Sequence, residues 1–122
     1  MKTKIIIAGT AGFIGVALGA FGAHGLKNSL PNEILEIYKT GVLYHLIHAA
    51  VLLAIALFDK NEYSKAFYFI TFGIILFSFS LYFYSMTAIK IFALITPIGG
   101  VSFLIGWTLI IWNGIKYNSK WK

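Results

Sequence analysis

Four long segments without a charged residue constrain this chain more than any other feature. They span residues 5–23, 41–58, 66–89 and 91–115, and each contains at least 18 residues. A helix needs about 20 apolar residues to cross the hydrocarbon core of a bilayer. Lipid offers no hydrogen-bond partner, so the backbone of each segment must satisfy itself by forming a helix. We therefore expect one all-α domain, an integral membrane four-helix bundle with spans at about 5–23, 41–58, 66–87 and 91–115.

The composition supports a membrane environment. Hydrophobic residues make up 59% of the chain and charged residues 11%, whereas soluble domains contain about 25% charged residues. The absence of cysteine excludes disulfides and thiolate metal sites. The net charge of +6 comes from lysines near the chain ends and between the apolar segments, where anionic lipid attracts them. We thus expect membrane lipids, and no nucleic acid, as partners.

The distribution of lysines predicts the orientation. An even number of crossings places the two termini and the connection around residues 59–65 on one side. That side carries Lys2, Lys4, Lys60, Lys65, Lys116, Lys120 and Lys122. The other side carries Lys27, Lys39 and Lys90. By the positive-inside rule we expect a multi-pass protein of the cell (inner) membrane with both termini in the cytoplasm.

Two span boundaries allow more than one interpretation: the start of the first span and the connection between the last two. The first 23 residues have the features of a secretory signal peptide, but we expect them to remain as the first span. The last two segments are separated only by Lys90. Pro97, Gly99 and Gly100 favour a tight hairpin with a break near the proline over one very long helix.

Residues 25–40 connect the first two spans. Pro31 suits the first turn of a helix, and acidic and apolar residues then follow at helical spacing through Thr40. Two interpretations stay open. One is a short amphipathic helix on the outer membrane surface; the other is a simple extension of the second span.

Small residues recur at three- and four-residue spacing in two spans. The set consists of Gly12, Gly15, Gly19, Gly22 and Ala23 in the first span and Gly99, Ser102 and Gly106 in the fourth. Residues 4–15 also resemble a dinucleotide-binding turn, but no strand–helix alternation follows them. Small residues let membrane helices approach closely. We therefore expect the first span to pack centrally against another span or another subunit.

Three histidines are candidates for a functional role. His45 and His48 share one face of the second span, and His24 ends the first span on the same side. Three imidazoles could bind zinc, copper or haem, although His24 and His48 differ in expected depth. The alternative is a neutral imidazole hydrogen-bonded inside the bundle to one of Tyr44, Ser80, Tyr82 and Thr96. We expect no metal and no cofactor, and we select His48 as the first residue to test because intramembrane ionisable groups often mark function.

No catalytic set is evident. The four acidic residues are Glu33, Glu36, Asp59 and Glu62, and all lie outside the apolar segments. No serine, histidine and acid share one depth. We expect a protein that is not an enzyme and has no catalytic residue.

Several motifs resemble those of a known family. The sequence GAFGAHGL spans residues 19–26, and TPIGG at residues 96–100 is followed by Phe103, Gly106 and Trp107. Together with Tyr44-x-x-x-His48-Ala49 and Ser78-x-Ser80-Leu81-Tyr82, they resemble uncharacterised protein family 0382, also called domain of unknown function 423. The resemblance covers essentially the whole chain and implies a four-span bacterial inner-membrane protein without an established activity. His45 stands where the family typically has glutamine, and Phe79 where it has glycine, which weakens a three-histidine metal site.

Two classes of function compete. The first is a non-enzymatic structural or accessory membrane protein that self-associates or joins another membrane protein. The second is a small transporter, channel or lipid-binding protein. Its site would consist of His24, His48, Ser80, Tyr82, Thr96, Pro97, Gly99 and Gly100. A redox or metal role through the histidines ranks third.

Overall fold

The computed structural model describes residues 2–120, with side chains through residue 117, and all its regular elements are helical. These are α1 (Lys2–His24), α2 (Asn32–Phe58), the 3-10 turn η1 (Asn61–Tyr63), α3 (Ser64–Gly73), the π-helical segment η2 (Ile74–Ser78), α4 (Phe79–Thr87) and α5 (Lys90–Lys120). From η1 to α4 the chain forms one continuous third span. Four helices are long and apolar enough to cross a membrane, which confirms the expected all-α membrane bundle.

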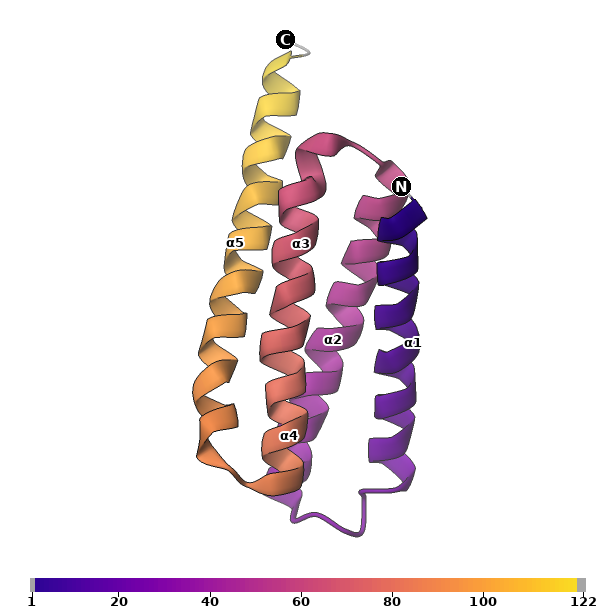
Figure 1. Ribbon diagram of the computed structural model, residues 1–122, viewed down its shortest axis with the longest axis vertical. Helices are drawn as coiled ribbons and strands as arrows, with labels where there is room; N and C mark the ends of the chain where they lie inside the picture. Colours follow the sequence, from indigo (N-terminus) through magenta and orange to yellow (C-terminus); the bar gives the residue numbers. More distant parts are fainter. Residues whose placement is uncertain (1, 121–122) are drawn as a thin grey trace.

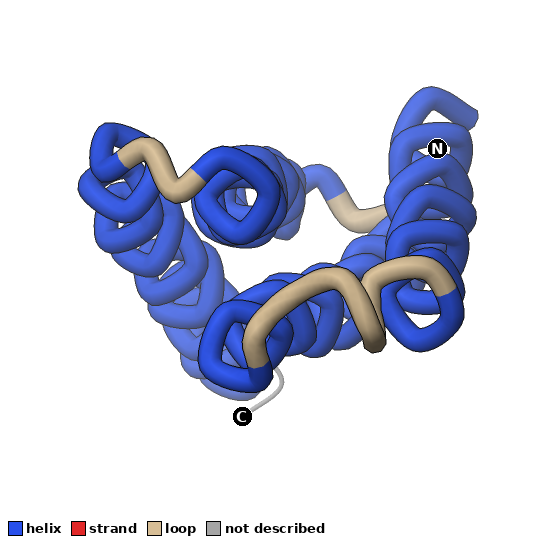
Figure 2. The backbone as a smooth tube through the Cα atoms, turned by 90° about the horizontal axis from the view of Figure 1, so that it is seen from below, coloured by secondary structure: helices blue, strands red, loops and turns tan. Residues whose placement is uncertain are grey.

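The helices run up and down in chain order. The described N- and C-terminal ends and the α2–η1 connection lie at one end of the bundle, and the α1–α2 and α4–α5 connections lie at the other (Figure 1). Seen along the bundle, α1 and α5 occupy opposite edges, with α2 and the third span between them (Figure 2). This arrangement places the described lysines of the two groups at opposite ends, whereas Lys122 lies outside the described residues.

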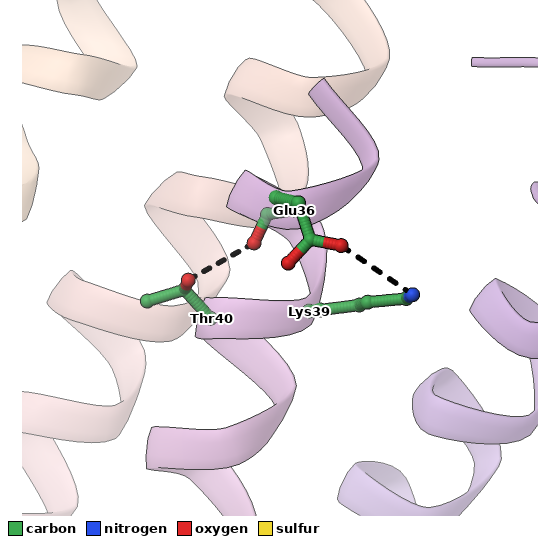
Figure 3. A network of polar contacts seen from close by, with 3 residues as sticks. All are labelled: Glu36, Lys39 and Thr40. Atoms are coloured by element: carbon green, nitrogen blue, oxygen red, sulfur yellow. Dashed lines mark hydrogen bonds and ion pairs between the residues drawn. The ribbon is translucent and has the colours of Figure 1, made fainter. Parts of the chain in front are cut away.

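Helix α2 begins at Asn32 and continues without a break to Phe58. The second interpretation is therefore the correct one: residues 32–40 extend the second span and form no separate surface helix, and residues 25–31 form the turn before it. Polar side chains stabilise this extension (Figure 3). The Thr40 hydroxyl donates to the Glu36 carbonyl at 2.9 Å, and Lys39 lies 3.5 Å from the Glu36 carboxylate.

Helix α5 continues through Pro97, so the expected break there is wrong. The chain reverses earlier, where Ala88 takes a left-handed conformation with φ of 57° and α4 ends. Proline removes one backbone hydrogen bond from a helix, but neighbouring helices compensate for such losses in membranes. Here the turns around Pro97 pack against the third span through Thr96 and Gly99.

Glycines bring α5 and the third span into close contact. A β-carbon on Gly99 would collide with the backbone nitrogen of Phe77, inside the π-helical segment. On Gly73 it would collide with the Phe103 ring, and on Gly106 it would lie 2.6 Å from Ile70 Cγ1. The small face expected on the fourth span is thus the face that meets the third.

A second set of glycines brings α1 against α2. A β-carbon on Gly15 would lie 2.8 Å from Leu46 Cδ2, one on Gly19 would lie 3.1 Å from Val42 Cγ1, and one on Gly22 would collide with the Tyr38 ring. Gly12 has no atom of another helix within that reach, and Ala23 is exposed.

The first span is peripheral, which corrects the expectation of a central position. Helix α1 packs chiefly against α2 and touches the third span near its own N-terminus, where Lys4 donates to the Ser64 hydroxyl at 2.5 Å. The spacing of its glycines indicated close packing with one neighbour. The glycine spacing carried no information on how many helices surround α1.

Gly99 provides a test of the contact between α5 and the third span. We expect Gly99→Ala to lower the free energy of unfolding by about 1–3 kcal/mol, because a methyl group would meet backbone that cannot rotate away. Gly114→Ala is the matched control on the same helix, where a β-carbon would have nothing within 4 Å. Thermal unfolding in detergent measures both variants. Equal melting temperatures would contradict the close contact.

Candidate functional site

His45 joins three elements from the centre of the bundle. Its side chain is 1% exposed. Nε2 lies 2.8 Å from the carbonyl oxygen of Ala11 in α1, and Nδ1 lies 2.9 Å from the hydroxyl oxygen of Tyr82 in α4. A carbonyl oxygen only accepts hydrogen bonds, so the Nε2–H donates to Ala11. In the neutral ring, Nδ1 then accepts the hydroxyl proton of Tyr82.

His48, one turn further along α2, carries its proton on the other ring nitrogen. Its Nδ1 lies 2.7 Å from the Tyr44 carbonyl oxygen, and the indole Nε1–H of Trp107 donates to Nε2 at 3.1 Å. The Phe103 ring stacks on the imidazole with 3.8 Å between ring centroids. Because an indole nitrogen only donates, Nε2 carries no proton and the ring is neutral with its proton on Nδ1.

The two imidazoles therefore have no free nitrogen to offer a ligand. A metal ion could reach His45 or His48 only by displacing Tyr82, Trp107 or a backbone carbonyl. Among the described residues, no three histidine, aspartate or glutamate side chains group into a candidate metal site. His24 is exposed at the end of α1 and does not join the other two histidines. The chemistry of the buried pair is hydrogen bonding between helices.

A second polar contact connects the third span to α5. The Ser80 and Thr96 hydroxyl oxygens lie 2.6 Å apart, and the Ser80 hydroxyl lies 2.7 Å from the Phe77 carbonyl oxygen. The Thr96 hydroxyl also lies 3.2 Å from the Phe92 carbonyl oxygen. These hydroxyls satisfy one another and their own helices.

The eight residues expected to form one ligand site contact different partners, and their binding of a ligand stays a prediction. His48 contacts Trp107, Tyr82 contacts His45, and Ser80 contacts Thr96. The remaining four are His24 on α1 and three positions on α5. His24 and Pro97 are exposed. Gly99 packs against the backbone of Phe77, and a β-carbon on Gly100 would lie 3.8 Å from the Phe77 ring.

Sequence reasoning missed several partners in this network. Trp107 was noted only as part of a motif, and its bond to His48 joins residues 59 positions apart. Tyr38, 2% exposed, donates from its hydroxyl to the Leu18 carbonyl at 2.5 Å. Asn113 donates its amide to the Glu62 carbonyl at 2.7 Å. Buried tyrosine, tryptophan and asparagine side chains require a hydrogen-bond partner. Their presence in apolar segments was the one sequence feature that could have indicated these contacts.

A pair of substitutions at His45 tests its role. We expect His45→Leu to cost about 1–3 kcal/mol of unfolding free energy, because the buried Tyr82 hydroxyl loses its acceptor. His45→Gln should retain most of the stability, since a carboxamide both donates and accepts. Thermal unfolding in detergent distinguishes the two variants. A His45→Leu protein as stable as the wild type would show that the network does not hold α1, α2 and α4 together.

Comparison with known proteins places the chain among membrane proteins. It is 43% identical to UPF0382 membrane protein YwdK of Bacillus subtilis over 96% of this chain and 99% of the relative. It is 38% identical to UPF0382 inner membrane protein YgdD of Escherichia coli K12, covering 98% of this chain and 94% of the relative. No solved structure matches. The family model described as "Protein of unknown function (DUF423)" matches residues 18–100, and the chain therefore belongs to this family of membrane proteins, uncharacterised protein family 0382.

Proposed function

We propose that this protein is a non-enzymatic accessory component of the membrane that self-associates through α1. The observation that carries the proposal is a largely exposed flank of α1, on which glycines, alanines and one valine stand at helical spacing beside the contact with α2. This small-residue flank consists of Gly9, Gly12, Val16, Ala20 and Ala23. A β-carbon on Gly9 or Gly12 would have nothing within 4 Å.

Glycine inside a helix costs about 1 kcal/mol relative to alanine. At Gly15 and Gly22 close neighbours on α2 account for the glycine, whereas at Gly9 and Gly12 no neighbour among the described residues does. In lipid, helices associate through close backbone contact at small residues. A second helix packed on the flank would contact Gly9 and Gly12 as closely as α2 contacts Gly15 and Gly22.

The flank continues into an apolar groove between α1 and α2. The groove has a volume of about 240 Å³. Its α1 wall includes Gly19 and Ala23, and its α2 wall includes Val42, Leu43 and Leu46. Small residues beside a shallow apolar groove suit the ridge of an apposed helix. A second copy is the simplest partner, because a two-fold pair uses one patch twice.

The interior favours this proposal over a transporter or channel within a single chain. Transport sites use freed backbone groups and unsatisfied polar side chains near the midplane. Here α5 continues past Pro97, and the buried imidazoles are saturated by Ala11, Tyr82, Tyr44 and Trp107. Among the described residues, the Ser78 hydroxyl is the one buried side-chain group without a hydrogen-bond partner.

We also propose that the end bearing both termini faces the cytoplasm. Seven of the ten lysines belong to that end by sequence, among them Lys122, which lies outside the described residues. Short connections at both ends suit the positive-inside rule.

Gly12→Leu tests self-association without disturbing the single chain, because a side chain at Gly12 projects into open space. We expect wild-type protein in lipid vesicles to show fluorescence energy transfer between copies and Gly12→Leu to lose most of it. Gly114→Leu on α5, equally unhindered within the chain, is the matched control and should behave as the wild type. Absence of energy transfer in the wild type, or its retention in Gly12→Leu, would refute association through this flank.

Reporter fusions test the orientation. We expect a cytoplasm-active reporter to be active when it follows the C-terminus and inactive when placed in the α1–α2 connection. Activity of a periplasm-specific reporter such as alkaline phosphatase at the C-terminus would reverse the proposed orientation.

A further inference from the structure

A polar pocket lies between the start of the third span and the last turns of α5. It has a volume of about 390 Å³. Glu62 and Lys65 line it from η1 and α3, and Leu109, Trp112 and Lys116 line it from α5. Its lining residues belong to η1, the start of α3 and the last turns of α5, and these elements lie toward the end of the bundle that bears the N-terminus (Figure 1).

The pocket is built on a fixed contact between its two walls. Asn113 is 8% exposed and donates its amide to the Glu62 carbonyl at 2.7 Å. This bond ties α5 to the turn before α3. The bond thereby holds together the two spans on which Lys65 and Lys116 stand.

The walls of the pocket are amphipathic. Leu109 is half-buried, Trp112 is 55% exposed, and the Lys116 ammonium lies 5.9 Å from the centre of the Trp112 ring. Tryptophan and lysine in this arrangement are typical of the level where hydrocarbon meets lipid head groups. A ligand here would have an apolar part along α5 and a polar part among the lysines.

The charge of the pocket favours an anion. Two lysines and one glutamate line it, which leaves a net charge of +1 on those side chains. Elsewhere at this end of the bundle, the described side chains include Lys2, Lys4 and Lys60 against Asp59. Basic pockets between membrane helices are typical binding places for anionic lipid head groups.

We propose that this pocket binds the phosphate of an anionic phospholipid, with Lys65 and Lys116 contacting the phosphate and the lipid's glycerol and first methylenes lying along Leu109 and Trp112. A lipid fits better than free phosphate because the pocket opens beside two spans and includes apolar surface that an inorganic ion would not use. The proposal is independent of self-association and differs in place from the lipid site expected near His48.

Lipid binding to the full-length protein in detergent tests the proposal by native mass spectrometry. We expect phosphatidylglycerol to bind more tightly than phosphatidylcholine. Lys65→Gln/Lys116→Gln should weaken phosphatidylglycerol binding by about 25-fold, since each lysine beside an anionic lipid contributes roughly a factor of five. Lys65→Arg/Lys116→Arg, which keeps both positive charges, should bind phosphatidylglycerol as tightly as the wild type.

The matched control is Lys2→Gln/Lys60→Gln, which removes the same charge from the same end outside the pocket and should bind as the wild type does. An equal loss in this control would show that diffuse charge, and no defined pocket, attracts the lipid. Equal binding of phosphatidylcholine, or displacement of phosphatidylglycerol by inorganic phosphate, would likewise overturn the assignment of an anionic lipid.

Discussion

Close approach of helix backbones at glycine positions is the contact on which the rest of this structure depends. In lipid the apolar surface of a helix gains little by leaving its solvent, so close packing and hydrogen bonds must hold the helices together. Gly99 lets α5 reach the backbone of Phe77, and Gly15 lets α1 reach His45. Those approaches bring polar side chains into range: Ser80 meets Thr96, and the His45 ring bridges to Ala11. A bulkier residue at either glycine would separate partners that cannot find water instead.

The polar interior and the polar surface have different roles. Inside, each imidazole nitrogen of His45 and His48 is used by a neighbouring helix or by the helix backbone, so the buried network serves cohesion. Outside, two features remain available: the small-residue flank of α1 and the lysine-lined pocket at the end of α5. The proposed interactions therefore involve the faces that the bundle presents to lipid, lipid head groups and other copies.

The number, order and approximate limits of the spans follow from the sequence because lipid imposes length and apolarity on each segment. Features that depend on contacts between helices could not be predicted from the sequence. The proline at position 97 predicts a break only when neighbours fail to compensate, and the neighbour here is the π-helical segment Ile74–Ser78, which no pattern indicated. The small-residue spacing identified Gly15, Gly19, Gly22 and Gly106 but not the side of the bundle on which α1 lies. His45, discounted as a departure from the family pattern, is the more deeply buried histidine. Tyr82 was among the expected partners of a buried imidazole, but only the packing of α2 against α4 shows that it bonds to His45.

Nitrogen-15 magnetic resonance of the histidine rings in a lipid bilayer tests most directly whether the buried pair is structural. The hydrogen bonds require a proton on Nε2 of His45 and a neutral His48 ring with its proton on Nδ1, because Ala11 and Tyr44 offer only acceptors and Trp107 only a donor. Burial in lipid favours the neutral form of His45 as well, in which Tyr82 donates to Nδ1. We predict a proton on Nε2 of His45 and on Nδ1 of His48 at neutral pH. A charged ring at His48, or the same tautomer at both positions, would contradict the network and reopen the interior as a place for proton or metal chemistry.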